Sequence, residues 1–291
     1  AMLAYVEAWK ANYVDAEAYT AYVIKNIDTY IKGSPDYVTI ANLVSPTGIF
    51  SQEYSNDYKA ARLVTFGYRY GTDNANETGT DGHLESWTLA EPIIRKQLPE
   101  IYVPIDTLKN LFMSQFTTDN RFGYDELSKP MKYYSNYVTG LSREYPIFSK
   151  INVVREGKDN TGDLGVFTSF IIWSRLEDIL LLRAEALVML NRSEDAINCL
   201  NELRGVRNLR NLSYLKDLKG DAKALLKEIF RERRRELMGE GHRWFDRIRE
   251  ARTVGDDDAM IKLINEGGIY WPIAEEVIRE NPSITQNEYW K

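Results

Sequence analysis

The segment 230–248, FRERRRELMGEGHRWFDRI, constrains the fold most because it interleaves many charged side chains with large apolar ones at helical spacing. A helix in open solvent does not need the apolar residues, and a fully buried helix cannot carry so many uncompensated charges. The segment therefore predicts a pair of helices whose charged groups are partly buried and pair with one another. The apolar residues involved are Leu237, Met238, Trp244, Phe245 and Ile248.

The charged residues of this segment and of the segment 175–185 have two interpretations. They are either a carboxylate pair for general acid–base catalysis or interhelical salt bridges that fix how the helices stack. Each carboxylate has arginines within helical reach, and such neighbours favour the ionised form, whereas a general acid must be protonated. We therefore expect no catalytic residue here and a structural ion-pair network of Arg175, Glu185, Glu232, Arg235, Glu236, Arg243 and Asp246.

Residues 166–291 are predicted to form a helical-repeat scaffold that ends in a turn-rich C-terminal strap. Apolar periodicity predicts four helices, over about 173–191, 193–205, 220–239 and 241–252. Ser193 and Asp221 are expected N-caps, and Gly205 an expected stop signal. The two helix–turn–helix pairs resemble tetratricopeptide-type units, although the link between them exceeds a strict 34-residue register.

The first part of the chain differs in texture. Residues 1–32 are helical by apolar period, whereas residues 33–165 are rich in Gly, Pro, Asn, Ser, Thr and Tyr. Within this loop-rich variable region the run 62–70 is expected to contain a strand, and Asp106 to cap a short helix. The predicted fold class is mainly α, with tetratricopeptide-like helical hairpins and a loop-rich, partly β or irregular middle region.

Bulk properties exclude several classes of protein. The net charge of −6, from 37 basic and 43 acidic residues, gives no global attraction to nucleic acid. Cys199 is the only cysteine, so no intrachain disulfide forms, and its helical neighbours predict a buried, inert thiol. No apolar run reaches the roughly 20 residues that span a bilayer. The start of the chain resembles the interior of a helix and not a signal peptide, so we expect the N-terminal portion to be missing.

No cofactor is expected. His242 is predicted to be structural, and His83 stands near Asp81 and Glu85 without a demonstrated set of converging ligands. Five residues of the run 73–81 carry oxygens of the kind that Ca²⁺ prefers, but their spacing fits no EF-hand. A solvated loop is the favoured interpretation and a Ca²⁺ site the alternative for Asp73, Asn74, Asn76, Glu77 and Asp81.

Aromatic residues of the middle region are the candidates for ligand binding. A sugar ring presents apolar C–H faces that stack on exposed aromatic planes, while Asn, Asp and Arg bind its hydroxyl groups. The alternative is that these aromatic side chains are buried against the helices, as most are. The candidates are Tyr68, Tyr70, Trp87, Tyr133, Tyr134 and Tyr137.

Four segments, taken together, resemble the SusD/RagB family of outer-membrane nutrient-binding lipoproteins. They are the AEAL of residues 184–187, the LNELR of residues 200–204, the ERRRELMGEGHRWFD of residues 232–246, and the WPI of residues 271–273 followed by Asn281-Pro282 and Gln286-Asn287. The resemblance is clear over about the last two fifths of the chain, and the helical start is more loosely similar.

The resemblance implies a non-enzymatic protein of the bacterial cell surface that captures a glycan or peptide for a SusC-type TonB-dependent transporter. It also implies a mostly helical fold, a location at the outer membrane and ligand residues in variable loops, so no family binding residue maps onto the segments matched here. The lipidated cysteine and the earlier helical repeats of the family are absent from this sequence. Membrane anchoring, through that lipid, and part of any ligand site therefore fall outside it.

Two other functions are weighed against a nutrient-binding protein. A helical-repeat adaptor would bind a protein or peptide partner through a continuous groove of apolar and charged residues. A glycoside hydrolase needs a carboxyl group held protonated, which the expected ion pairing of the carboxylates disfavours.

Overall fold

The computed structural model describes residues 1–30, 37–51, 62–67, 83–113, 119–125, 127–130, 132–155 and 166–291. Elements of the first half are α1 (Met2–Trp9), α2 (Tyr13–Tyr30), α3 (Ile40–Val44), β1 (Arg62–Phe66), α4 (Leu84–Thr88), α5 (Ile105–Phe112), β2 (Phe122–Asp125), β3 (Lys132–Ser135), β4 (Val138–Thr139) and β5 (Ile147–Phe148). Elements of the second half are β6 (Ile171–Arg175), α6 (Leu176–Met189), α7 (Ser193–Val206), α8 (Ala222–Glu236), α9 (Arg243–Val254), α10 (Asp258–Asn265), α11 (Glu275–Glu280) and the 3₁₀ turn η2 (Glu288–Trp290).

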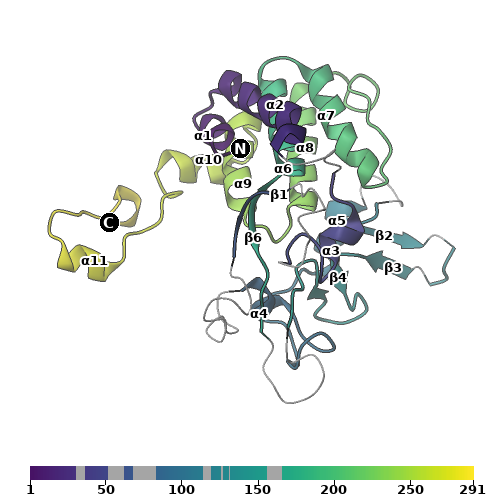
Figure 1. Ribbon diagram of the computed structural model, residues 1–291. Coiled ribbons are helices and arrows are strands. Elements are labelled where there is room, and N and C mark those ends of the chain that lie inside the picture. The colour runs from purple at the N-terminus through teal and green to yellow at the C-terminus, as the bar shows by residue number, and fades with distance from the viewer. Residues whose placement is uncertain are drawn as a thin grey trace.

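Helix α6 lies at the centre of the helical part, in contact with α2, α7 and α8 (Figure 1). Its sequence, LEDILLLRAEALVM, places apolar or small residues on every side, which is typical of a helix enclosed by others. The pairs α6–α7 and α8–α9 are the two predicted helical hairpins, and α1–α2 is a third. The mainly α fold class with stacked hairpins is confirmed.

The scaffold helices begin and end a few residues away from the predicted positions. The largest difference concerns the predicted helix 173–191, whose first residues form the strand β6 before α6 begins at Leu176. Ile171, Ile172 and Trp173 are β-branched or aromatic, and such residues favour a strand where a partner strand is available. The partner is β1, which a pattern confined to the later segment does not reveal.

Helix capping follows the prediction at one position only. The Asp221 side chain accepts a hydrogen bond from the backbone N–H of Lys223 at 2.8 Å and caps α8, as expected. The prediction for Ser193 is wrong, because the N-cap position is Arg192 and no side chain caps that helix. Gly205 does not stop α7, which continues to Val206.

The short helix α5 also begins without the expected cap. Pro104 occupies its N-cap position with extended backbone, and Asp106 lies within the first turn. The prediction for Asp106 is therefore wrong about the cap. A carboxylate in the first turn still interacts favourably with the positive end of the helix dipole.

Each described strand pairs with one other in an antiparallel two-stranded sheet. The ribbon of β1 and β6 runs from the helical part toward α4 (Figure 1), with Phe66 opposite Ile171 at its far end. Hairpins β2–β3 and β4–β5 belong to the middle region. The strand expected within 62–70 is confirmed over Arg62–Phe66, and residues 68–70 lie outside the described residues.

Two large apolar clusters form the core. One lies among α6, α7 and α8, and Leu181, Leu200 and Leu225 are fully buried in it. The other belongs mostly to the middle region and includes Phe112 and Phe122. The loop-rich part therefore has an apolar core of its own, and its loops are held by buried side chains as well as by hydrogen bonds.

The C-terminal segment, from Tyr270 onward, projects from the helical part (Figure 1). It is turn-rich, as expected, and its hydrogen bonds close mainly upon itself. The Gln286 side chain pairs with both backbone polar groups of Ile273, at 2.9 Å each. Among the described residues, none of the helices combines the length and the apolar character that crossing a bilayer requires.

Candidate ligand-binding site

A buried lattice of ion pairs joins the middle region to the helical scaffold. Its centre is Glu236, whose carboxylate is fully buried at the end of α8. Glu236 accepts hydrogen bonds from Arg207 at 2.6 and 2.8 Å, from Arg175 at 2.8 Å and from Arg121 at 3.0 Å. These arginines come from three separate segments, so a single carboxylate fixes the relative positions of all of them.

Further ion pairs extend the lattice along α8 and α9. Glu232 lies 2.6 Å from a nitrogen of Arg121 and 2.9 Å from one of Arg235. Asp246 of α9 lies 3.0 Å from Arg233 and 2.8 Å from Arg249. A guanidinium nitrogen of Arg249 also lies 3.1 Å from a carboxylate oxygen of Glu185 on α6.

Arg243 differs from the other residues predicted for this network. Its side chain is 46% exposed and contacts Glu250 at 3.3 Å, on the surface of α9. The expectation that it belongs to the buried network is wrong, because Arg243 begins α9 on the side that faces solvent. Arg233 and Arg249 hold the buried positions beside Asp246 instead.

Several lattice members lie outside the two segments from which the network was predicted. Lys150 is the clearest, because its ammonium group is fully buried and donates to the carbonyl oxygens of Glu236 at 2.7 Å and Met238 at 2.9 Å. The one signal in the sequence is a lysine within the apolar run IFSKINVV. The other members outside the two segments are Asp119, Arg121, Arg204, Arg207 and Arg249. Arg233 and Glu240 lie within the segment 230–248 but were not singled out, whereas Glu177 and Asp178 were among the charged residues of 175–185 expected to pair.

The buried carboxylates of the lattice have the protonation state of structural ion pairs and not that of a general acid. Burial alone would raise the pKa of Glu236, but the charges of Arg207 and Arg175 outweigh it and hold that pKa well below the usual value. In the same way, burial would raise the pKa of Glu240, but the positive charges of Arg175 and Lys150 outweigh this effect and lower that pKa to about 2. Carboxylates that stay ionised at neutral pH do not act as general acids.

The lattice also positions a turn that forms one wall of a cavity. Glu240, between α8 and α9, accepts from Arg175 at 2.9 Å and from Lys150 at 2.5 Å. Its neighbours Gly239 and Gly241 both have positive φ, 81° and 84°, which glycine adopts at little cost. This turn lines a cavity of about 600 Å³, which we call the Trp87 pocket.

Aromatic side chains from three segments surround the Trp87 pocket. Trp87 belongs to α4, Phe66 to the end of β1, and Phe170 immediately precedes β6. Trp87 is 42% exposed and Phe66 55% exposed, so both rings present apolar surface to solvent in a hollow. An exposed aromatic ring beside polar groups is the arrangement that binds ligands with one apolar face and several hydroxyl groups.

Polar groups complete the wall of the Trp87 pocket. The Ser169 hydroxyl donates to the buried Glu85 carboxylate at 2.9 Å, and His83 Nδ1 lies 3.3 Å from the same hydroxyl oxygen. Burial raises the pKa of Glu85, partly offset by the bond from Ser169. Since the serine proton is directed at Glu85 and not at His83, this arrangement orients polar groups and does not activate a nucleophile.

The six aromatic candidates have different fates. Trp87 lines the pocket, whereas Tyr137 is fully buried beneath the Lys150 ammonium, 4.7 Å from its ring centroid. The prediction that Tyr137 binds a ligand is wrong, because the lattice covers it. Tyr133 and Tyr134 lie on β3, away from the residues that line the Trp87 pocket. Tyr68 and Tyr70 lie outside the described residues.

No group of His, Cys, Asp or Glu side chains suited to hold a metal ion occurs within the described residues. The five residues considered for Ca²⁺, from Asp73 to Asp81, lie outside the described residues. They include Asp81, which was also considered as a neighbour of His83. Cys199 is buried as expected, and burial raises the pKa of its thiol to about 11. Such a thiol remains protonated and unreactive at neutral pH.

Stacked helical hairpins that support a loop-rich region define the class of helical-repeat scaffold proteins. Residues 149–256 match the model of the SusD family. A SusD superfamily protein from Bacteroides thetaiotaomicron is 42% identical, with a TM-score of 0.84 over 99% of this chain and 57% of that one. The chain therefore resembles the SusD family in sequence over residues 149–256 and shares the fold of a SusD superfamily protein along nearly its whole length.

Other relatives agree with this assignment. SusD-like protein P38 of Formosa agariphila is 36% identical over 121 residues, which are 40% of this chain and 24% of that protein. Surface glycan-binding protein A from Bacteroides uniformis shares the fold at 17% identity, with a TM-score of 0.54 over 99% of this chain and 60% of that one. The chain thus spans little more than half the length of the solved relatives it matches.

Proposed function

We propose that the protein binds glycans at the cell surface without catalysis and delivers them to a SusC-type TonB-dependent transporter. The match of residues 149–256 to the SusD family model supports this proposal, and one structural neighbour is named a surface glycan-binding protein. The observation that carries it is the exposed Trp87 ring in a hollow of about 600 Å³.

The Trp87 pocket offers the two kinds of contact that a sugar requires. The Trp87 and Phe66 rings take the apolar C–H face, and the polar groups of His83 and Ser169 take hydroxyl groups. A rigid pocket loses less conformational entropy on binding, and here the lattice and the β1–β6 ribbon hold the wall in place. The pocket would therefore bind without rearranging the scaffold.

Isothermal titration of neutral and acidic oligosaccharides into the 291-residue chain tests this proposal. Binding that saturates at one site, with a sugar-dependent change in the fluorescence of a tryptophan, is the expected result. The absence of binding to every oligosaccharide, or turnover of any glycosidic bond, would contradict a non-enzymatic glycan-binding protein.

A second candidate function, recognition of a protein partner, is favoured by a different feature. An apolar groove of about 930 Å³ lies between α1, α2 and β1. Met2, Leu3 and Tyr22 line it and are each more than half exposed. Contiguous exposed apolar surface of this kind commonly marks protein contacts. We propose that this groove contacts the SusC-type transporter. Leu3→Glu should then weaken copurification of the protein with that transporter.

A further inference from the structure

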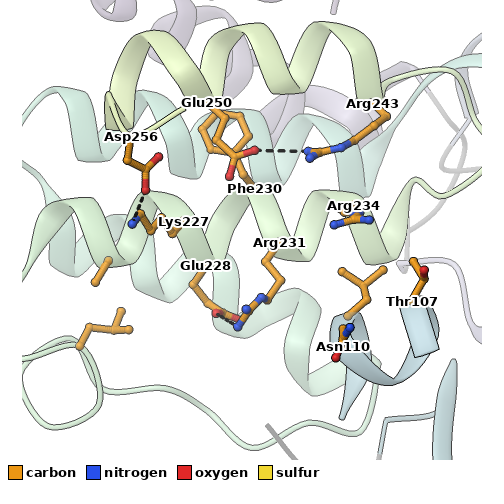
Figure 2. A pocket seen from close by; sticks show the side chains of 13 residues that line it. Thr107, Asn110, Lys227, Glu228, Phe230, Arg231, Arg234, Arg243, Glu250 and Asp256 are labelled. Carbon is orange, nitrogen blue, oxygen red and sulfur yellow. Dashed lines mark hydrogen bonds and ion pairs between the residues drawn. The ribbon is translucent and has the colours of Figure 1, made fainter. Parts of the chain in front are cut away.

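A second polar cavity, of about 720 Å³, lies between α5, α8 and α9. It shares no lining residue with the Trp87 pocket, and we call it the basic cleft. Figure 2 shows α8 along its floor, with Arg243 reaching across from α9 and Asn110 on α5 at the opposite side. Phe230 lies at the base of the cleft but is almost fully buried, so the cleft presents charge and hydrogen-bonding groups and not a stacking platform.

Among the residues that line the basic cleft, cationic side chains outnumber carboxylates by one. Four cationic side chains and three carboxylates line it. Three cations each contact one carboxylate, as the dashed lines of Figure 2 show: Lys227 with Asp256, Arg231 with Glu228 at 3.6 Å, and Arg243 with Glu250 at 3.3 Å. The fourth, Arg234, makes no ion pair and no hydrogen bond within the part of the chain that the structure describes.

The surroundings of Arg234 favour an added anion. Partial burial lowers the pKa of its guanidinium group, and the positive charge of Arg243 lowers it further, while the nearby Glu250 carboxylate acts in the opposite direction. A ligand carboxylate at this position would relieve that repulsion and give a guanidinium–carboxylate contact, which is among the strongest hydrogen-bonding arrangements in proteins. Thr107 and Asn110 line the same cleft, and their side chains make no hydrogen bond with another described residue.

We propose that the basic cleft binds a uronate unit of an acidic oligosaccharide, with Arg234 holding the carboxylate and Thr107 and Asn110 contacting hydroxyl groups. A uronate carries one carboxylate per ring and several neutral hydroxyl groups. The single surplus guanidinium matches the carboxylate, and the hydroxyl groups can donate to the carboxylates that line the cleft. An acidic peptide would bring additional negative charges toward Glu228, Glu250 and Asp256, so it fits less well. This inference rests on the proposed glycan binding and adds a substrate class to it.

Titration calorimetry with trisaccharides of galacturonate, glucuronate and mannuronate, each beside its neutral methyl ester, tests this assignment. At least one acid should bind about tenfold more tightly than its ester, since a charge-assisted hydrogen bond is commonly worth a factor of this size. Arg234→Gln should reduce the affinity for that acid to the level of the ester. The difference should shrink as NaCl is raised, because salt screens the exposed charges.

Arg192→Gln is the matched control, because Arg192 is a half-exposed arginine outside the cleft, and it should leave the affinity unchanged. Circular dichroism and thermal unfolding would show that Arg234→Gln folds normally. Equal binding of every acid and its ester, no effect of Arg234→Gln, or tighter Arg234-dependent binding of pentaglutamate would overturn the proposal. Titration of Trp87→Ala with a neutral oligosaccharide tests the proposed glycan binding separately. If Trp87→Ala loses affinity for that oligosaccharide while Arg234→Gln has no effect on any acid, glycan binding is supported and only the uronate site is excluded.

Discussion

Arg121 and Glu236 lie 115 positions apart in the chain and are joined by a hydrogen bond of 3.0 Å between fully buried side chains. Arg121 precedes the β2–β3 hairpin of the middle region, and Glu236 ends the scaffold helix α8. The contact therefore attaches the loop-rich region to the helical hairpins. Arg175 and Arg207 converge on the same carboxylate, so removing Glu236 would leave three buried guanidinium groups facing one another.

Glu236→Gln should destabilise the fold by about 3–5 kcal/mol, because buried charges that lose their partner are costly. Urea unfolding followed by circular dichroism measures the loss. Arg192→Gln, which breaks an exposed ion pair with Asp195, should cost less than about 1 kcal/mol. Similar effects of the two substitutions would show that the lattice contributes little to stability.

Stability should decrease in acid because of Glu240. Its pKa is about 2 in the folded protein against an ordinary value of 4.5, so the unfolded state binds the proton more readily between these values. The contribution of this carboxylate is therefore complete above about pH 4.5 and is lost as the pH falls toward 2. Urea unfolding between pH 2 and 7 should show a shallower acid dependence for Glu240→Gln than for the unsubstituted chain; parallel curves would contradict this expectation.

Trp87→Ala should weaken binding of a neutral oligosaccharide by about tenfold or more, because a tryptophan in a pocket commonly contributes a large share of binding energy. Its fold should persist, since the ring is partly exposed. Trp290→Ala is the matched control, since Trp290 is exposed to a similar degree (45%) in the C-terminal segment. Calorimetric titration of both variants is the measurement, and equal affinities would exclude the Trp87 pocket as the binding site.

Gly239 and Gly241 offer a matched pair for testing the turn between α8 and α9. Both have positive φ, so alanine at either position should cost about 1–2 kcal/mol of backbone strain. A Cβ at Gly239 would also lie 2.6 Å from the Phe148 ring, whereas at Gly241 it would meet nothing within 4 Å. Overpacking should add roughly 1–3 kcal/mol for Gly239→Ala alone. Thermal unfolding of the two variants compares them, and equal losses would show that the turn can move away from Phe148.

The local sequence was sufficient for features that depend on neighbours along the chain. The order of the scaffold helices follows from apolar periodicity, and the cap at Asp221 from a residue type at a helix start. Pairing such as that of Glu232 with Arg235, three residues apart on one helix, follows from helical geometry. The pairing of buried charges was predictable for the same reason. A segment that mixes many charged and apolar residues buries some of its charged groups, and these need partners of opposite charge.

Only the tertiary structure decided which distant segments supply the partners and which aromatic rings stay exposed. Arg121 and Lys150 join the lattice from the middle region, and the local sequence does not specify their partners, although Lys150 stands in an apolar run. Tyr137 and Trp87 are both aromatic residues in loop-rich surroundings, yet one is fully buried and the other lines a pocket. The physical reason is that burial depends on which other segment covers a side chain, and that covering is a long-range contact not encoded in local periodicity.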